Sequence, residues 1–464
     1  MSTNRLYDEI NIGDQASINR VVTPEDLVVF AHASGNLNPM HNPKLDGNAD
    51  GANEAIAPSM WVGSLFSAVI GNVLPGIGTL YESQSLEFTD RAHVGESLHV
   101  GVTVAEKLEN NRIALDCLIT RDGEAPIAKG RAVVVAPQTK VTMDDLDVAG
   151  LLVQEHKHFD ALVARCQHLD PLATAVVCPE DSNSLAGAML AKEKGLIIPI
   201  LVGDRAHIEK AAAEENIDIS GCQIEHIEGH APAASRAVAM VHEGHARAVM
   251  KGHIHSDDLL RAVATSKGGL RTNKRITHIF VMDVPGVDHL ISVSDAAVNI
   301  LPDLETKVQI VQNAIDLVRA IGTDTPRVGI LSAVETVNPK IPSTLDAAVI
   351  SKMAERGQIR GGIVDGPLAM DNAMDIEAAR TKGIKSLVAG QADVLIVPNL
   401  EAGNMLAKEL TFVAHAEAAG LVLGAKVPVM LTSRADNAQS RLASCALAIM
   451  YDYFLTHGEP YSEA

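Results

Sequence analysis

Four polar segments in the second half of the sequence carry residue types that can bind an anion. They begin at Ala248, Val364, Pro398 and Thr432, and each follows or contains a short apolar run. Glycines in these segments let backbone N–H groups approach an anion, and helix N-termini favour negative charge. Because ligands of parallel sheets bind beyond the carboxyl ends of the strands, we expect these segments to carry the binding chemistry.

Ser433 and Arg434 lie in the last of these segments and are the candidates for direct chemistry. The guanidinium of Arg434 can bind two oxygens of a phosphate group at once. The hydroxyl of Ser433 can donate a hydrogen bond to an oxyanion or to sulfur. A Ser-Arg pair at a strand end is more often a helix cap with a surface ion pair, so the pair alone does not establish a function.

Several other binding patterns are absent from the sequence. There is no Gly-x-x-x-x-Gly-Lys-[Ser/Thr] loop and no strand-linked Gly-x-Gly-x-x-Gly, which argues against P-loop and Rossmann nucleotide binding. The 18 histidines include His242 with His245 and His253 with His255, but neither spacing is that of a helical zinc motif. We predict no metal site and no cofactor.

The composition is that of an acidic globular protein. A net charge of −20 argues against nucleic-acid binding, which requires a concentrated basic surface. Five scattered cysteines without a Cys-x-x-Cys pair, together with a polar N-terminus, predict a cytoplasmic protein with reduced thiols. No apolar run reaches the ~18 residues that a membrane span requires, so no membrane partner is expected.

The chain of 464 residues is too long for one ordinary core, and its two parts differ in pattern. Within residues 1–140, one helix is predicted to start at Thr23, and an apolar helical segment is predicted at 60–73. Antiparallel strands are predicted after them at 79–88, 97–105, 112–120 and 128–135. Residues 141–154 are a polar and mixed linker. From 155 to 464, short β runs alternate with Ala-rich helices, which predicts an α/β domain with a mainly parallel sheet.

The second part contains a set of ordered motifs. They are, in chain order, Met250-Lys-Gly, Ser294-Asp-Ala-Ala-Val-Asn299, Pro302-Asp-Leu-Glu-Thr-Lys307, Asn313-Ala, Val364-Asp-Gly-Pro-Leu, Glu401-Ala-Gly-Asn404 with Lys408, and Pro428-Val-x-x-Thr-Ser-Arg434. In this order they resemble the phosphate acetyl/butyryltransferase family. The resemblance covers about 300 residues and is closer to the butyryl branch. It implies direct acyl transfer between CoA and phosphate, and two α/β subdomains similar to the isocitrate/isopropylmalate dehydrogenase fold.

The resemblance also implies roles for individual residues. Arg434 would bind phosphate, Ser433 would stabilise the oxyanion or thiolate, and Arg261 would be a second phosphate-directing arginine. The other residues expected to bind phosphate or CoA are Lys251, Gly252, Asp365, Gly366, Gly403, Asn404, Lys408 and Asp436.

Two departures from the acetyl branch concern acyl preference and the thiol proton. The arginine that follows the Gly-Asn…Lys segment in that branch is replaced here by Thr411-Phe412. The acidic residue after Ser-Arg falls near Ser440, although Asp436 lies closer to the pair.

The first part contains the segment Phe30-Ala-His-Ala-Ser-Gly-Asn-Leu-Asn-Pro-Met-His41. This segment resembles the signature of the MaoC-like (R)-specific enoyl-CoA hydratases, which have a hot-dog fold and in which an Asp and a His five positions later activate water. The His matches His41, but the Asp position is Asn36, and an amide cannot take a proton from water as a carboxylate does. The oxyanion glycine of that family appears as Ser59, and Ser67 lies further along the central helix.

Three hypotheses remain for the function. The principal one is an acyl-CoA:phosphate acyltransferase. The first part is then either an active hydratase that uses His41 alone, or a non-catalytic module for CoA esters or oligomerisation; hot-dog domains usually pair, so a homo-oligomer is expected. The basic cluster at 267–275 is either an ordinary exposed loop or an attractor of CoA phosphates.

Overall fold

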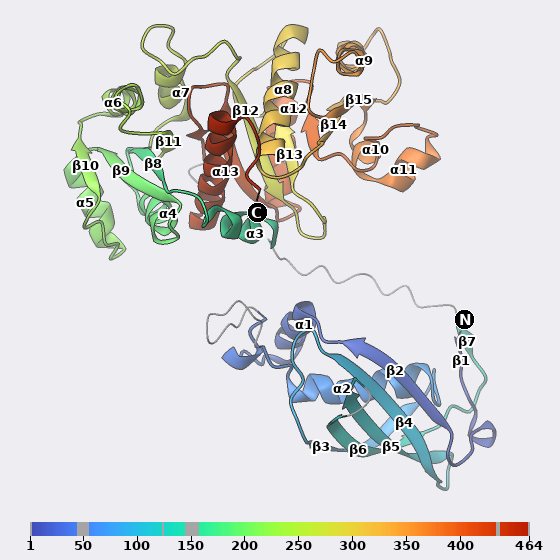
Figure 1. Ribbon diagram of the computed structural model, residues 1–464. Coiled ribbons are helices and arrows are strands. Elements are labelled where there is room, and N and C mark those ends of the chain that lie inside the picture. Colours follow the sequence, from blue (N-terminus) through green and yellow to red (C-terminus); the bar gives the residue numbers. More distant parts are fainter. Residues whose placement is uncertain (1, 44–54, 123–124, 144–156, 433–436, 463–464) are drawn as a thin grey trace. The chain divides into compact units, whose positions relative to one another are not determined.

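The computed structural model describes residues 2–43, 55–122, 125–143, 157–432 and 437–462. The chain divides into two compact units, Met1–Val153 and Gln154–Ala464 (Figure 1). Each unit has its own buried apolar core. Among the described residues, no helix is long and apolar enough to cross a membrane.

The first unit is an antiparallel sheet with the strand order β2-β4-β5-β6-β3. In β4, alternate residues from Leu98 to Val104 are buried, as expected for a sheet with one buried face. The four predicted strands are confirmed, and β2 is additional to them. The strands are β2 (Gln15–Val21), β3 (Leu80–Phe88), β4 (Ser97–Lys107), β5 (Arg112–Arg121) and β6 (Ala125–Val135).

Two helices complete this unit. Helix α1 (Pro24–Ser34) begins at Thr23 as predicted, because the Thr23 hydroxyl accepts a hydrogen bond from Asp26 N and the Asp26 carboxylate accepts one from Thr23 N. Helix α2 (Ser59–Asn72) buries Trp61 and Phe66 in the same cluster as the inward-facing strand residues. Strand β1 (Ser2–Thr3) pairs with β7 (Thr142–Met143), so the start of the predicted linker is hydrogen-bonded to the start of the chain.

The second unit is built on one sheet of eleven strands with the order β10-β9-β8-β11-β18-β17-β12-β13-β16-β14-β15. Seven of the ten neighbouring pairs are parallel, so the predicted mainly parallel sheet is confirmed. The strands are β8 (Leu172–Val177), β9 (Ile197–Gly203), β10 (Gln223–His226), β11 (Ala248–Lys251), β12 (Thr277–Asp283), β13 (Ile291–Ser294), β14 (Arg327–Leu331), β15 (Ile363–Leu368), β16 (Val394–Ile396), β17 (Glu417–Leu423) and β18 (Val429–Met430).

The three antiparallel pairs lie together at the centre of the sheet and reverse its direction. They are β18 with β17, β17 with β12, and β12 with β13. Met430, Leu421, Ile279 and Ser294 are successive partners in one row across these four strands. Strands β18 and β13 therefore run in opposite directions, and their C-terminal ends lie at opposite ends of the sheet.

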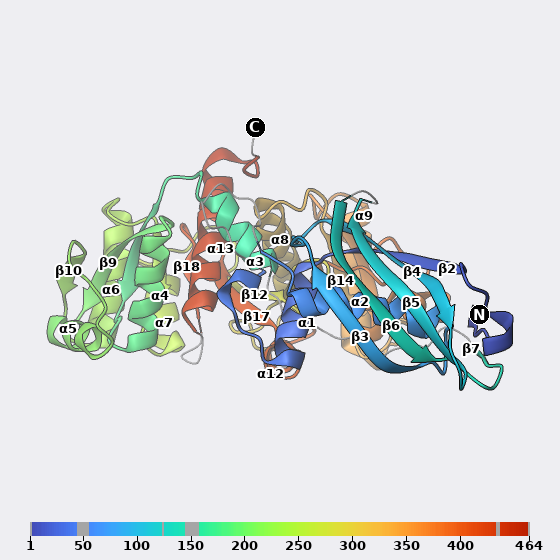
Figure 2. The same ribbon diagram turned by 90° about the horizontal axis from the view of Figure 1, so that it is seen from below.

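Helices cover both faces of this sheet (Figures 1 and 2). One apolar cluster joins α3, α4, α5, α8, α9 and α13 to alternate strand residues such as Val176, and two clusters on the other face join α6 with α7 and α10 with α11 and α12. The helices are α3 (Lys157–Cys166), α4 (Ser182–Glu193), α5 (Arg205–Glu214), α6 (His230–His242), α7 (Ser256–Ala264), α8 (Leu304–Ala320), α9 (Pro342–Glu355), α10 (Met370–Met374), α11 (Ile376–Thr381), α12 (Leu400–Phe412) and α13 (Ala438–His457).

Candidate active site

The C-terminal ends of the neighbouring parallel strands β8, β11 and β18 lie at the same end of the sheet. The candidate site is described from the residues at these strand ends. Gly252, directly after β11, donates its backbone N–H to Val177 O at 2.8 Å, and His253 donates to Cys178 O at 2.6 Å. A Cβ atom on Gly252 would lie 2.5 Å from Val177 O, so a glycine is required for this close approach of the two chains. Lys251 and Gly252 are therefore held beside the loop that follows β8.

A buried arginine on α13 joins the ends of β11 and β18. Arg441 is 1% exposed, and its Nη1 donates to Lys251 O at 3.1 Å and to Thr432 Oγ1 at 2.6 Å. Lys251 is also buried. Helix α13 thus fixes the position of Thr432, the residue directly before Ser433. Ser433, Arg434 and Asp436 lie outside the described residues.

An aspartate and a histidine meet next to these strand ends. His253 Nδ1 lies 3.2 Å from Asp181 Oδ2, and the Ser184 hydroxyl and backbone N–H donate to the Asp181 carboxylate at 2.8 and 3.0 Å. Burial would raise the pKa of Asp181, but the hydrogen bonds from Ser184 and the charges of His253 and Arg441 outweigh it, so this pKa is lowered. Asp181 is also the N-cap of α4, which explains why the chain places a carboxylate here.

Glu180 makes a second group of polar contacts at the same end of the sheet. It accepts a hydrogen bond from Asp204 N at 3.1 Å, and its Oε2 lies 3.5 Å from His207 Nδ1 and 3.9 Å from His230 Nε2. The backbone of Cys178 has a φ of 52°, and this left-handed turn directs the chain from β8 toward Glu180 and Asp181. Within the described part of the chain, no group of three or more His, Cys, Asp or Glu residues could hold a metal ion.

Arg261 lies in the last turn of α7, the helix that follows the loop containing His253. Its side chain is 74% exposed and forms an ion pair with Asp258 at 3.3 Å. The exposed guanidinium is available to an anion, but its described ion pair holds it on the helix surface. The structure therefore places Arg261 on the same connection as Lys251 and Gly252, with its side chain in solvent.

The predicted residues of α12 lie beyond the end of β13. A Cβ atom on Gly403 would lie 2.8 Å from Asp295 O, so the glycine lets α12 pack directly on the loop after β13. Asn404 Nδ2 donates to Ala296 O at 3.4 Å, and Lys408 is exposed one turn later. These contacts give Gly403 and Asn404 a packing role.

Asp295 organises the loop on which α12 packs. It is 2% exposed, and its carboxylate accepts hydrogen bonds from the backbone N–H groups of Ala297 and Val298 at 3.0 Å and of Asn299 at 3.2 Å. Much of the Ser294–Asn299 motif is therefore explained by the hydrogen bonds of one turn.

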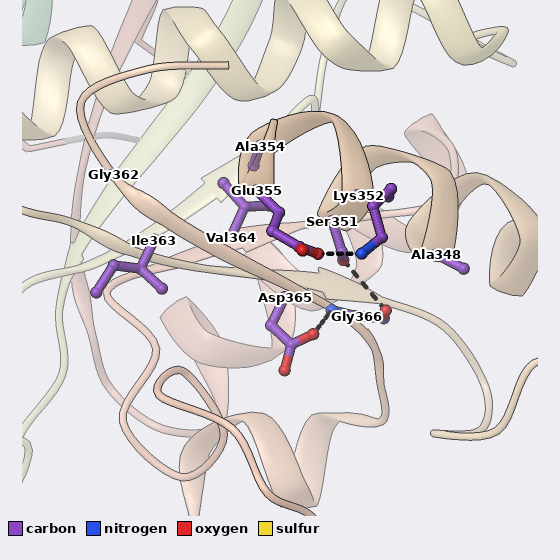
Figure 3. A pocket seen from close by; sticks show the side chains of 10 residues that line it. All are labelled: Ala348, Ser351, Lys352, Ala354, Glu355, Gly362, Ile363, Val364, Asp365 and Gly366. Carbon is purple, nitrogen blue, oxygen red and sulfur yellow. Dashed lines mark hydrogen bonds and ion pairs between the residues drawn. The ribbon is translucent and has the colours of Figure 1, made fainter. Parts of the chain in front are cut away.

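Asp365 and Gly366 lie in a different place, on the edge strand β15. They line a pocket of about 460 Å³ between β15 and α9, in which Asp365 Oδ1 accepts a hydrogen bond from Gly366 N at 2.8 Å (Figure 3). Lys352 of α9 forms an ion pair with Glu355 at the same pocket. Six strands separate β15 from β11 in the sheet, so the structure does not place this pair beside Lys251 and Gly252.

A buried histidine at the centre of the sheet was not among the predicted residues. His278 of β12 is completely buried, and burial lowers its pKa to about 4 even though nearby Asp295 favours the charged form. The Leu431 backbone lies close to the ring, but neither ring nitrogen makes a hydrogen bond of ordinary geometry within the described residues. His278 is therefore neutral at pH 7.

All four predicted residues of the first unit, Asn36, His41, Ser59 and Ser67, lie in the described part of the chain. His41, at the end of the 3-10 helix Pro39–His41, has its Nδ1 2.6 Å from Ile56 O. A carbonyl oxygen only accepts, so Nδ1 carries the proton and Nε2 can act as a base. Asn36 Oδ1 accepts from Asn38 N at 3.2 Å. Ser59 and Ser67 are exposed on α2.

Glu180, Asp181, Arg441 and His253 are site residues that the sequence prediction missed; the sequence suggested His253 only as a possible metal ligand. A signal for the first two was present, because Pro179-Glu180-Asp181 directly follows the short β run Ala173–Cys178 in the sequence. Arg441 gave no local signal, since it lies within an otherwise apolar helical stretch. The five cysteines are all free, and burial raises the pKa of Cys178 to about 12.

Comparisons with known proteins agree with this two-part organisation. Residues 231–449 match the family model described as Phosphate acetyl/butaryl transferase, and residues 11–117 match the MaoC like domain. A phosphate acetyltransferase of Rhizobium meliloti is 57% identical over 63% of this chain and 93% of its own length. A phosphate butyryltransferase of Clostridium beijerinckii is 41% identical over 63% of this chain and 97% of its own length.

The similarity extends to a solved structure. A branched-chain phosphotransacylase from Enterococcus faecalis V583 has a TM-score of 0.53 and 29% sequence identity. The alignment covers 61% of this chain and 99% of that chain. The two structures thus share the architecture of the second unit.

Proposed function

Because this chain belongs to the phosphate acetyl/butyryl transferase family, we propose that its second unit interconverts acyl-CoA plus phosphate and acyl phosphate plus CoA. The observation that carries the proposal is the joining of β11 and β18 by Arg441. This contact places Lys251 and Gly252 beside the strand that leads into Ser433 and Arg434. In a chain of net charge −20, Arg434 and the exposed Arg261 would supply local positive charge for anionic substrates.

The proposed chemistry is direct acyl transfer. A phosphate oxygen attacks the thioester carbonyl carbon, the C–S bond breaks, and CoA leaves. The barrier arises from bringing two anions together and from charge on the carbonyl oxygen, so positioning and electrostatic stabilisation supply the catalysis. Arg434 binds phosphate, Ser433 stabilises the oxyanion or the thiolate, and no metal or other cofactor takes part.

Most of the remaining predicted residues have proposed roles in substrate binding. Arg261 is exposed at the same end of the sheet as Lys251 and attracts phosphate groups. Lys408 is exposed on α12 and attracts the phosphates of CoA. Gly403 and Asn404 set the position of α12, and Asp436 stays a proposed contact of substrate. Asp365 and Gly366 lie on β15, which six strands separate from β11, so we do not propose a contact of theirs with substrate beside Lys251.

The proposal also concerns the fold relationship of the second unit, the acyl group that it prefers, and the location and oligomeric state of the protein. The two parallel halves joined by antiparallel β17 and β12 support a likeness to the isocitrate/isopropylmalate dehydrogenase fold. The Thr411-Phe412 replacement supports a preference for butyryl or other acyl groups beyond acetyl. We also propose that the protein is cytoplasmic and that it forms a homo-oligomer. Size-exclusion chromatography with light scattering would test the oligomeric state.

The transferase proposal is tested by phosphate-dependent release of CoA thiol. Purified full-length protein is incubated with acetyl-CoA or butyryl-CoA, with and without phosphate, and free thiol is followed. We expect release only with phosphate, and a loss of ~10²-fold or more in Arg434→Ala. Arg380→Ala, which removes an exposed arginine of α11, is the matched control and should keep full activity. Absence of phosphate-dependent release in the unmodified protein would refute the proposal.

A second candidate function is hydration of 2-enoyl-CoA by the first unit. The contact of His41 Nδ1 with Ile56 O favours it, because this contact leaves Nε2 as a base. The competing proposal is a non-catalytic module that binds CoA esters or joins subunits. Loss of crotonyl-CoA absorbance that survives Asn36→Ala but not His41→Ala would establish a hydratase that uses histidine alone, whereas unchanged absorbance with the unmodified protein would favour the non-catalytic module.

A further inference from the structure

Acyl transfer between CoA and phosphate requires a proton to move between the substrates. Hydrogen phosphate carries a proton that acyl phosphate lacks, and the departing sulfur must gain one. A free thiol has a pKa of about 8.5, so a group that carries this proton near pH 7 would accelerate both directions. This inference rests on the proposed transferase function and concerns which side chain carries the proton.

Several described groups at this edge are unsuited to carrying the proton. Ser440 is buried in the first turn of α13, where its N–H is capped by Asn437 Oδ1 at 2.8 Å, and its hydroxyl is neutral. Burial raises the pKa of the Cys178 thiol to about 12, so it stays protonated. Arg441 is permanently charged. Asp181 has a lowered pKa and stays ionised.

His253 has the geometry that the others lack. Its backbone N–H is fixed on Cys178 O at 2.6 Å, and its Nδ1 lies 3.2 Å from Asp181 Oδ2. An ionised carboxylate accepts from Nδ1–H, which leaves Nε2 to receive and release a proton. Asp181 is itself held by Ser184, so the imidazole has a supported orientation. The side chain is 47% exposed and therefore accessible to substrate.

Arg441 links the loop that carries His253 to the residue directly before Ser433. Its Nη1 donates to Lys251 O, two residues before His253, and to Thr432 Oγ1.

We propose that His253, oriented by Asp181, carries the proton between phosphate and the CoA sulfur. As the phosphate oxygen forms its bond to the carbonyl carbon, Nε2 takes the proton of hydrogen phosphate. As the C–S bond breaks, the sulfur leaves with the electron pair and takes that proton from the imidazolium. The products are acyl phosphate and CoA thiol, and His253 returns to its starting form without solvent taking part.

Charged groups from the surrounding elements face this dyad. Asp181 and Ser184 come from the start of α4, and Arg441 of α13 acts on Asp181. The ring of His230 from α6 lies 6.4 Å from that of His253, and Glu180 contacts His230. Lys251 lies two residues earlier on the same chain.

The test compares His253→Asn with His255→Asn. His255 is exposed in the same loop and makes no side-chain cap bond to α7, so its variant controls for loss of a surface histidine. The rate of CoA consumption by acyl phosphate is measured from pH 6 to pH 9.5. We expect His253→Asn to lose ~10²-fold or more in kcat at pH 7, with little change in either KM.

The pH profile separates proton transfer from a structural role. Above the thiol pKa of ~8.5, CoA is already a thiolate and needs no base. The part of the His253→Asn deficit that comes from deprotonating sulfur should therefore disappear by pH 9.5, while the part that comes from protonating the departing phosphate remains. Asp181→Asn keeps an N-cap residue while removing the charge, and we expect a smaller loss with the same pH trend. A deficit that is equal at every pH, or no deficit, would overturn the inference. If the unmodified protein shows no phosphate-dependent activity at all, the transferase proposal itself fails.

Discussion

Gly187 of α4 leaves the space that the side chain of Arg441 occupies. A Cβ atom on Gly187 would lie 2.8 Å from Arg441 Cβ and closer still to its Cδ. The absence of one side chain on α4 therefore permits α13 to deliver a buried guanidinium to Lys251 O and Thr432 Oγ1. This packing contact links the helix layer to the strand ends where we place the chemistry.

The substitution Gly187→Ala tests that link. We expect it to destabilise the second unit by about 1–3 kcal/mol, because the added methyl group overlaps atoms that cannot move without breaking the Arg441 hydrogen bonds. Transferase activity should fall as well, since Thr432 directly precedes Ser433. Gly71→Ala in α2, where the added atom meets nothing within 4 Å, is the matched control and should be neutral or slightly stabilising. Urea unfolding of the full chain measures both; equal stability of the two variants would contradict the packing argument.

Replacing Asp295 by Asn should loosen the loop beneath α12. An amide has one acceptor oxygen in place of two, so some of the N–H groups of residues 297–299 lose their partner. We expect a cost of about 1–3 kcal/mol in unfolding free energy. Asp288→Asn, at a side chain that is 96% exposed, should change it by less than ~0.5 kcal/mol. A similar effect of the two substitutions would show that the buried turn is not important for stability.

His278 should make the second unit sensitive to acid. Its pKa is about 4 in the folded protein and near 6.5 in an unfolded chain, so the unfolded state binds more protons between these values. The stabilisation is therefore complete above pH 6.5 and is lost as the pH falls toward 4, amounting to roughly 3 kcal/mol when the loss is complete.

The variant His278→Leu should remove this pH dependence. Between pH 8 and pH 5.5, the unmodified protein should lose about 1 kcal/mol more unfolding free energy than the variant. His168→Leu, at an exposed histidine after α3, should behave like the unmodified protein. Parallel pH curves for the unmodified protein and His278→Leu would show that this group does not titrate as described.

Asn36→Asp should increase any hydratase activity of the first unit. A carboxylate at this position can accept a proton from water, which the amide cannot do, so we expect a gain of ~10-fold or more in crotonyl-CoA hydration. The double variant Asn36→Asp with His41→Asn should lose that gain. Asn38→Asp, two positions away, is the control for added charge. An unchanged rate in Asn36→Asp would indicate that this surface does not bind enoyl-CoA in a productive way.

Local pattern accounts for the features that the sequence determined by itself. The capping box at Thr23, the apolar α2 and the strands at Thr79–Val135 follow from short-range rules of hydrogen bonding and residue period. The alternation of β runs with Ala-rich helices predicted the α/β unit for the same reason. The two-part organisation and the transferase family were also evident from ordered motifs such as Val364–Leu368 and Thr432–Arg434.

Only the tertiary structure decided how these pieces meet. Strand direction depends on which distant segment supplies hydrogen bonds, and the reversal through β17 and β12 has no local signal. That reversal separates the edge that carries Lys251 and His253 from the edge that carries Asp295 and α12. The burial of Arg441 also could not be predicted from the local sequence. A charged side chain can be buried only where distant groups supply its hydrogen bonds, and here Gly187 of another helix supplies the space.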